Sequence, residues 1–437
     1  MRPTRTLKLL AVAAMSASLI TLSACGAGSR TGASTATQVA CDFDNPTEKT
    51  TVNVLAYNSS AVDPFTNTMV KSCTHDNVTV KHDPIDFAGQ VQKTTATLSG
   101  DKGSYDILET YSFIIGANAA DQKLRPLDDL MAKYSSEYKL DQLDKSMLEG
   151  MSYEGKLYGV PMQAQMYVMA YRKDVFEKNG ITPPTTLDEM VVAAKKIQDA
   201  GDVKYPIALP WLATGDISTQ YQAMMNAFGT DFVDPTTKKA QFDTDKGRAA
   251  LNAMKSLQPY MDPQVTTFDQ PKVQQQMFNG TAAMAIMFSG RMNDLTIETN
   301  SKYASQFGFA APPAATAGGP LFSRLSIDGW SIPVNTQLDE NLLFELIASS
   351  VSEDASKASI PAAFPARQGV VTKDSSPYAQ AALDSVARTV PPVSAPYTPD
   401  VSNAVISLIA QTVLGKLSVE EGSKQMQAAA DKVLAEY

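Results

Sequence analysis

The sequence predicts an α/β protein folded into two lobes, each built on a mainly parallel sheet with helices on its faces. The chain has 437 residues, more than one compact core usually holds. Its apolar fraction of 44% is ordinary for a globular protein. Near the N-terminus, strand-like and helix-like stretches alternate, and this order is typical of parallel strands joined by crossover helices.

The alternation begins with a predicted strand over 51–57 (TVNVLAY), which is rich in β-branched and aromatic residues. A helix over 65–72, a strand over 78–82, a helix over 87–99 and a strand over 105–109 follow. We expect these elements to form the first sheet, with the helices covering it.

The stretch 153–201 supplies the longest apolar run and the clearest helix signals. Residues 157–171 read as a buried strand, and a short helix over 174–179 ends at Gly180. Pro183 and Pro184 exclude helix there. Thr186 and Glu189 then form a capping-box pattern at the start of a helix that ends at Gly201.

The C-terminal half continues the mixture of strands and helices. The predicted strands are 205–211, 282–287, 307–311 and 326–333, and the predicted helices are 219–228, 245–260, 273–279, 340–349 and 418–437. Ser418 and Glu421 form a second capping-box pattern.

Three phrases in order resemble family 1 of the bacterial extracellular solute-binding proteins, the capture subunits of ABC importers. They are Glu154–Pro161 (EGKLYGVP), Tyr171–Ile181 (YRKDVFEKNGI) and Pro184–Glu189 (PTTLDE). Further similar phrases lie at 280–287, 326–333 and 364–370, so the resemblance covers residues 51 to 437.

The resemblance implies a type II periplasmic-binding-protein-like fold, in which hinge strands join the two lobes. Carried onto this chain, lobe 1 comprises 42–162 and 313–365, lobe 2 comprises 168–308 and 369–437, and the crossovers lie near 163–167, 309–312 and 366–368. We expect a monomer.

The N-terminus reads as a signal for export. Arg2, Arg5 and Lys8 precede an apolar run over 9–22, which is too short to span a bilayer as a stable helix. Leu22–Cys25 (LSAC) resembles a bacterial lipobox, which implies removal of residues 1–24 and a lipid on Cys25. The alternative is an ordinary signal peptide. Cleavage takes the net charge from −9 to −12, so the acyl anchor must hold the chain at an anionic membrane.

Residues 25–41 are small and polar and are predicted to be a flexible tether. Cys41 and Cys73 remain in the exported chain, where pairing is favoured. The alternative is two free buried thiols.

Composition and motifs argue against several functions. The Lys and Arg residues are scattered, which disfavours nucleic-acid binding. His75 and His82 have no third ligand near them in the sequence, so we expect no metal, and no cofactor fingerprint appears. We therefore predict that the protein is not an enzyme, although carboxylates are too plentiful to exclude a glycosidase.

Sugar recognition needs aromatic faces and planar polar groups, and sites in α/β sheets lie beyond the carboxyl ends of strands. This rule selects Tyr57, Asn58, Glu109, Tyr111, Gln163, Tyr167, Trp211, Phe288, Asp328, Gly329, Trp330 and Arg367. The same strand ends and the first crossover also contain Thr110, Gln165, Ser289 and Arg291. The alternatives are core packing for the aromatic residues, a solvated loop for Glu109 and an ion pair between lobes for Arg367.

Together these features indicate an extracytoplasmic, lipid-anchored solute-binding protein. It would capture a sugar or oligosaccharide by cleft closure and deliver it to the membrane permease subunits of an ABC importer. The alternatives are a binding protein for a non-sugar solute, such as an oligopeptide or polyamine, and a surface glycoside hydrolase.

Overall fold

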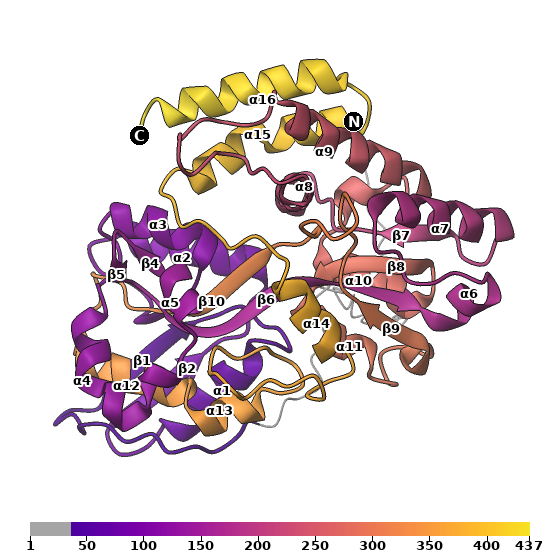
Figure 1. Cartoon of the computed structure of the whole chain (residues 1–437). Helices are drawn as coiled ribbons and strands as arrows, with labels where there is room; N and C mark the ends of the chain where they lie inside the picture. Colours follow the sequence, from indigo (N-terminus) through magenta and orange to yellow (C-terminus); the bar gives the residue numbers. More distant parts are fainter. Residues whose placement is uncertain (1–35) are drawn as a thin grey trace, which may run out of the picture.

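The computed structural model describes residues 36–437, which form two α/β lobes lying side by side (Figure 1). The predicted signal peptide, Cys25 and most of the predicted tether lie outside the described residues. The strands are β1 (Thr50–Leu55), β2 (Val78–His82), β3 (Ile107–Tyr111), β4 (Ser152–Tyr153), β5 (Lys156–Leu157), β6 (Val160–Arg172), β7 (Tyr205–Ala208), β8 (Ala282–Phe288), β9 (Phe307–Ala310) and β10 (Leu325–Ser331).

Strand β6 runs through both lobes and joins their sheets. Its first half pairs with β10, and its second half, from Tyr167 on, pairs with β8 and β9. The strand order is therefore β2-β1-β3-β10-β6-β8-β7, with β9 also paired to β6. All but one of the residues of β6 are buried, which explains why its sequence is almost continuously apolar.

Lobe 1 contains β1, β2, β3, β10 and the first half of β6. Its helices are α1 (Asp63–Ser72), α2 (Phe87–Ser99), α3 (Ser112–Ala120), α4 (Asp128–Tyr138), α5 (Lys145–Gly150), α12 (Glu340–Ser350) and α13 (Glu353–Ala358). β1 is parallel to β2 and β3, as predicted, whereas β10 is antiparallel to both of its neighbours. Phe65 and Trp330 are among the fully buried side chains of its core.

Lobe 2 contains the second half of β6 with β7, β8 and β9. Its helices are α6 (Lys173–Lys178), α7 (Leu187–Ala200), α8 (Asp216–Ala227), α9 (Asp245–Leu257), α10 (Gln270–Asn279), α11 (Met292–Leu295), α14 (Ala379–Val386), α15 (Thr398–Val413) and α16 (Val419–Leu434). Only β7 and β8 are parallel here, so this lobe's sheet is mixed. The prediction of a mainly parallel sheet does not hold for lobe 2, because β6 enters from lobe 1 against the direction of β8 and β9.

The second passage between the lobes lies later in the chain than the expected 309–312. Residues 313–323, which we expected in lobe 1, pack on lobe 2: Ala314 pairs with Thr186, and Phe322 lies in the lobe 2 core. The chain returns to lobe 1 within β10. The passage expected at 366–368 lies beside the hinge, where Ala366 N–H donates to the carbonyl of Met162 over 2.9 Å.

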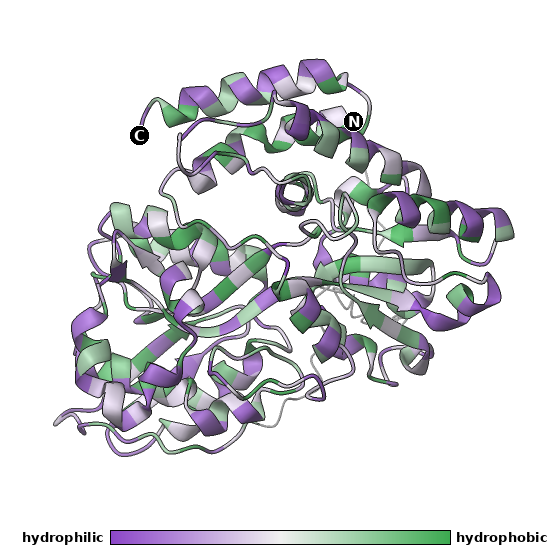
Figure 2. Ribbon diagram, viewed as in Figure 1, coloured by the Kyte–Doolittle hydropathy of each residue, from purple (hydrophilic) through white to green (hydrophobic). Residues whose placement is uncertain are grey.

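Local signals in the sequence account for several boundaries. The capping boxes of Thr186 and Ser418 are confirmed at the starts of α7 and α16. β4 and β5 form a hairpin whose two central residues, Glu154 and Gly155, both have positive φ angles. Figure 2 shows apolar residues concentrated in the strands, while outer helices such as α7 and α16 alternate apolar and polar stretches, as expected for one buried face.

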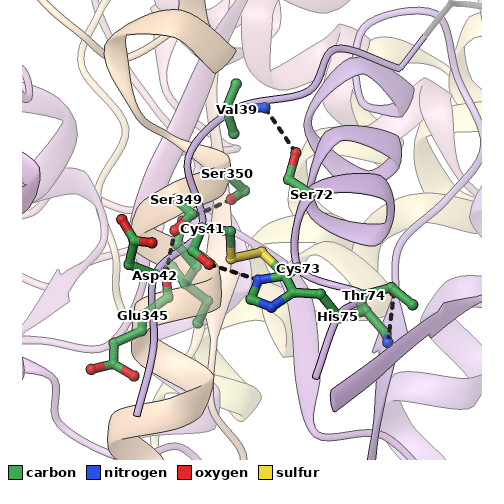
Figure 3. Close-up of a disulfide and its surroundings, with 12 residues drawn as sticks. Val39, Cys41, Asp42, Ser72, Cys73, Thr74, His75, Glu345, Ser349 and Ser350 are labelled. Atoms are coloured by element: carbon green, nitrogen blue, oxygen red, sulfur yellow. Dashed lines mark hydrogen bonds between the residues drawn. A yellow bond between two sulfur atoms is a disulfide. The ribbon is translucent and has the colours of Figure 1, made fainter. Parts of the chain in front are cut away.

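The first described residues form a strap along lobe 1 (Figure 3). A disulfide joins Cys41 to Cys73 at the end of α1, and Val39 N–H donates to Ser72 Oγ over 3.0 Å. The ring of His75 lies 4.5 Å from that of Phe43, and its Nε2 is 2.9 Å from the Cys41 carbonyl. Part of the predicted tether is therefore fixed to the folded body rather than free.

Candidate ligand-binding site

The ends of β1 and β3 bring Tyr57 and Glu109 together. The strands are parallel neighbours, with Leu55 opposite Leu108, so Glu109 lies beside the residues that follow β1. Glu109 Oε2 accepts a hydrogen bond of 2.8 Å from Tyr57 N–H. Its Oε1 is buried and meets no donor at full hydrogen-bond geometry among residues 36–437, although the Tyr111 hydroxyl lies close enough to act on the pKa of Glu109. This oxygen is therefore an acceptor available to a donor that enters the site.

A second carboxylate, Asp328 on β10, is held by amides of the hinge strand. Its Oδ2 accepts from Gln165 Nε2 over 2.5 Å and from Gln163 Nε2 over 3.2 Å, and its Oδ1 accepts from Ser326 Oγ over 3.0 Å. The two glutamines are two residues apart on β6 and so share one face of the sheet. Asp328 lies opposite Tyr111 of β3, which places both carboxylates in one cluster.

The electrostatics of this cluster favour hydrogen-bond donors. Burial raises the pKa of Asp328 to about 6. Burial, and next the charge of Asp328, raise the pKa of Glu109 well above its ordinary value. In the described part of the chain, neither carboxylate has an Arg or Lys among its main electrostatic neighbours. Hydroxyl or ammonium groups of a ligand would supply a donor to Glu109 Oε1 and further donors to the oxygens of Asp328.

Aromatic rings border the carboxylates on the lobe 1 side. The ring of Phe87, at the start of α2, lies 5.7 Å from Tyr57 and 5.6 Å from Tyr111. Tyr111 is stacked on Phe113 at 5.2 Å, and its hydroxyl donates to Gln90 Oε1 over 3.3 Å. Phe87 is 45% exposed, so this aromatic border reaches the solvent.

Lobe 2 faces the cluster with aromatic and amide side chains. Tyr167 lies edge-on to Phe288 at 4.7 Å, and Gln220 lies next to the Tyr167 hydroxyl. The Tyr167 hydroxyl, the Trp211 indole N–H and both amide atoms of Gln220 are buried and meet no partner at full hydrogen-bond geometry in the described residues, although Gln220 lies close enough to the Tyr167 hydroxyl to act on its pKa. Buried polar atoms are rarely left unpaired in proteins, and lobe 1 has such atoms as well, at Gln163 Oε1 and Trp330 Nε1.

Charged groups of lobe 2 complete the surroundings. Burial, and next the charge of Asp269, raise the pKa of Asp216 to about 7. The positive charge of Arg291 works against the rise in the pKa of both Asp216 in lobe 2 and Tyr57 in lobe 1. Within residues 36–437 no group of three potential metal ligands occurs, and no helix is long and apolar enough to cross a membrane.

Residues 54–355 match the family described as bacterial extracellular solute-binding protein, which is more than half of the chain. The chain belongs to this family. The resemblance found in the sequence is therefore confirmed, and membership places this solute-binding protein outside the cell's cytoplasm and among binding proteins rather than enzymes.

Known relatives agree with this assignment. The solute-binding protein is 26% identical over 272 residues to a mannitol-binding protein of Pseudomonas aeruginosa, a match that covers 61% of this chain and 58% of the relative. It is 23% identical over 330 residues to an erythritol/L-threitol-binding protein of Mycolicibacterium smegmatis, covering 70% and 68% of the two chains. The chain thus spans less than two thirds of the mannitol-binding protein.

Solved structures confirm the fold. The maltose-bound MalE3 of T. maritima superposes with a TM-score of 0.78 at 17% identity, covering 87% of this chain and 99% of that one. A solute-binding protein of Agrobacterium vitis with bound D-mannitol gives a TM-score of 0.74 at 23% identity, covering 88% and 98%. At these identities the likeness establishes the two-lobed fold and nothing finer.

The structure brings Tyr57, Glu109, Tyr111, Gln163 and Asp328 together, and Tyr167 and Phe288 lie on the lobe 2 side, whereas Trp211 is fully buried in the lobe 2 core. Trp330 is not brought to the cleft surface as expected. Its side chain is fully buried in the lobe 1 core, opposite Glu109 in the β3–β10 ladder. Gly329 faces the Val160 carbonyl, which a Cβ would meet at 2.5 Å, so it serves strand packing.

Arg367 and Asn58 also have structural partners. The Arg367 guanidinium donates to the carbonyls of Val351, Lys139 and Tyr138, all in lobe 1, so it makes no ion pair between the lobes. Asn58 Nδ2 donates to both carboxylate oxygens of Asp63, at 2.9 and 2.8 Å. Asn58 thereby shapes the loop after β1.

The sequence reasoning missed Phe87, Phe113 and Gln220. Phe87 follows the end of β2 by five residues, and the strand-end rule, applied there, would have selected it. Phe113 and Gln220 lie within helices that begin just after strands or their loops, where sequence gives no sign of which side faces a ligand.

Proposed function

We propose that this protein is the lipid-anchored capture subunit of an ABC importer for a sugar or polyol. A ligand enters between the lobes, β6 and its neighbours bend, and the lobes close over it. The closed form then presents the ligand to the membrane permease. Closure follows only from a higher affinity of the ligand for the closed state.

The observation that carries this proposal is the pair of buried carboxylates, Glu109 and Asp328, bordered by aromatic rings. Each hydroxyl of a polyol can donate one hydrogen bond, and a carboxylate can accept several. The Gln165 and Gln163 amides add planar donors and acceptors, and Phe87 and Tyr111 offer flat faces to the C–H side of a carbon chain or ring.

The names of the relatives support the polyol part of the proposal. Binding proteins named for mannitol and for erythritol or L-threitol match this chain in sequence, and proteins with bound maltose, ribitol and D-mannitol share its fold. Linear polyols present hydroxyls without a ring, which suits a site rich in acceptors.

Thermal unfolding in the presence of D-mannitol, erythritol, ribitol, maltose and trisaccharides tests the proposal. A true ligand at 100 times its Kd adds about 2.7 kcal/mol to the free energy of unfolding. Gln165→Ala should remove most of this gain, whereas Gln275→Ala, on an exposed face of α10, should keep it. A screen in which no polyol or sugar stabilises the protein contradicts the proposal.

Two buried carboxylates without a cationic partner also fit a cationic solute such as a polyamine. Spermidine therefore belongs in the same screen. Stabilisation by spermidine that disappears at high salt, with none by polyols, would support this second candidate. A bound sugar should be recovered unaltered, and hydrolysed product in excess of the protein would instead indicate a glycoside hydrolase.

The anchor part of the proposal rests on Leu22–Cys25, outside the described residues. Cys25→Ala should release the protein from membranes or leave its precursor uncleaved. Unchanged membrane fractionation and mass in that variant would contradict the anchor.

A further inference from the structure

The lobes touch at more than one place: Ser394, before α15, donates to the carbonyls of Ser112 and Gly150 in lobe 1, and a short turn that follows β8 makes a second contact. This turn, η4 (Ser289–Arg291), belongs to lobe 2, and its central residue is Gly290. Ser60, in the lobe 1 loop before α1, donates from its hydroxyl to the Gly290 carbonyl over 3.2 Å. The two residues are 230 positions apart, so this bond links the lobes directly.

Gly290 leaves no room for a side chain at this contact. A Cβ there would lie 2.7 Å from Gln165 Oε1 and 2.9 Å from the Ala61 Cβ, both closer than real Cβ contacts. Gly290 is not among the glycines with a positive φ angle. Its backbone conformation is therefore open to other residues, and the approach of lobe 1 and the hinge strand is what requires glycine.

Next to this contact lies a cavity of about 240 Å³, which Ser60 and Pro64 line from lobe 1 and Asn293 and Ile297 line from lobe 2. A turn that touches the opposite lobe beside an open space acts as a stop for their approach.

Gln165 connects this contact to the candidate ligand site, because its side chain touches both Gly290 and Asp328. The Oε1 of Gln165 is the atom nearest to the missing Cβ of Gly290, and its Nε2 donates to Asp328 Oδ2 over 2.5 Å. The amide therefore lies between the carboxylate proposed to bind ligand and the point where lobe 2 arrives. A displacement of either neighbour changes the position of this one side chain.

We propose that Gly290 is a closure contact of the two lobes on the side of the hinge where η4 lies, and that the absence of a side chain there lets the η4 turn pack against Ser60, Ala61 and Gln165. A side chain at position 290 keeps the lobes apart and weakens ligand binding without disturbing either lobe. The proposal rests on the proposed function only for the identity of the ligand.

The first experiment needs no ligand. Ala61→Cys combined with Gly290→Cys should form a cross-link under mild oxidation, because the Cβ atoms of a disulfide lie about 3.8 Å apart and the lobes need to yield by only about an ångström. Peptide mapping identifies the new disulfide, and each single cysteine variant serves as its control. If both thiols stay reactive in a variant that melts like the wild type, the contact does not form and the proposal is overturned.

The second experiment measures D-mannitol affinity by calorimetry and lobe closure by small-angle scattering. Gly290→Val should weaken binding at least tenfold. It should also prevent the decrease in radius of gyration that we expect when the wild type binds ligand. Gly290→Ala should have a smaller effect in the same direction. Gly100→Ala is the matched control, because a Cβ there meets nothing closer than 3.4 Å and the residue is exposed. Its affinity should stay within twofold of the wild type.

The outcomes separate the two proposals. Wild-type affinity and contraction in Gly290→Val overturn the closure contact. A wild-type protein that binds none of the screened sugars or polyols overturns the proposed function, and the cross-link still decides whether the lobes meet at Gly290. Melting of Gly290→Val near the wild-type temperature shows that the loss of affinity does not come from unfolding.

Discussion

The two sides of the candidate site differ in how their buried polar groups are satisfied. On lobe 1, Glu109 and Asp328 each accept hydrogen bonds from their neighbours. On lobe 2, the side-chain polar groups of Tyr167, Trp211 and Gln220 meet no partner at full hydrogen-bond geometry within residues 36–437, and the Tyr167 hydroxyl and the Gln220 amide have chiefly each other. Lobe 1 also keeps buried oxygens without a partner, Glu109 Oε1 and Gln163 Oε1, so the difference is that its carboxylates are held by several donors whereas the lobe 2 groups are not.

This difference gives the two lobes different expected roles in ligand binding. Side chains that already hold their bound positions need little rearrangement to bind a ligand, so they lose little conformational entropy on binding. A side with unpaired groups gains its hydrogen bonds only when ligand or water arrives, and that gain favours the closed state over the open one. Under the proposed function, we expect a ligand to meet the organised carboxylates of lobe 1 before it contacts lobe 2.

The largest expected effect separates structural from binding residues on lobe 1. Trp330→Ala should lower the free energy of unfolding by about 3–5 kcal/mol, because the indole is fully buried in the lobe 1 core. Below its melting temperature the variant should bind the ligand nearly as well as the wild type. Trp330→Phe, which keeps most of the bulk, should lose much less. If the variant is as stable as the wild type but binds the ligand tenfold more weakly, Trp330 belongs to the ligand site and not to the core.

The case of Trp330 shows what the sequence could and could not predict. The strand, its glycine and its place in the family pattern are local features, and β10 lies within two residues of its predicted bounds. Which side chains of β10 line the cleft depends on a register shift between Asp328 and Gly329 in its pairing with β6. Such an irregularity is set by the partner strand, and no property of the sequence around it indicates the shift.

The same reasoning explains the rest of the site. Tyr57, Glu109 and Asp328 were predictable because they end strands or follow a recognisable phrase. Arg367 was not, since its carbonyl partners come from segments more than 200 residues away as well as from Val351. Phe87 and Gln220 lie on helices, and whether their side chains point toward the site depends on how the two lobes pack together.

A second test concerns the buried charge of lobe 1. The folded pKa of Asp328, about 6, is above its ordinary value of 3.8, so the native state binds its proton more tightly than the unfolded state does. Stability from this group is complete below pH 4 and falls as the pH rises through 6. The shift of about two units corresponds to about 3 kcal/mol. Asp328→Asn should therefore be more stable than the wild type at pH 7 and weaker in ligand binding.

The amide in Asp328→Asn can keep the present contacts. Its oxygen accepts from Gln163 and Gln165, and its nitrogen donates to Ser326 Oγ. Denaturant titrations of both proteins from pH 4 to 7 isolate the effect, because other carboxylates cancel in the difference. A stability difference that does not change with pH would contradict the assignment.

A third test addresses lobe 2. Gln220→Met keeps the shape of the side chain and removes two buried polar atoms that meet no partner at full hydrogen-bond geometry in the described chain. The free energy of unfolding without ligand should rise by about 1–3 kcal/mol, the cost of leaving such groups unpaired. Ligand affinity should fall in the same variant. On lobe 1, Gln163→Met removes one oxygen without a partner but also a donor to Asp328, so its free energy of unfolding should rise less than that of Gln220→Met. Equal gains for the two variants would remove the distinction between the lobes.

The smallest expected effect lies at the exposed end of the aromatic border. Phe87 is 45% exposed and contacts Tyr57 and Tyr111 only at ring distances of 5.6–5.7 Å, so Phe87→Ala should change folding stability little. If the ring covers a bound polyol or sugar, affinity should fall by about 0.5–1.5 kcal/mol, roughly twofold to tenfold. Val91→Ala is the matched control, since Val91 lies one turn further along α2 and is 40% exposed. Calorimetric titration of both variants decides the role of Phe87. Equal affinities in the two variants would mean that the border ends at Tyr111 and that lobe 1 binds its ligand through the buried network alone.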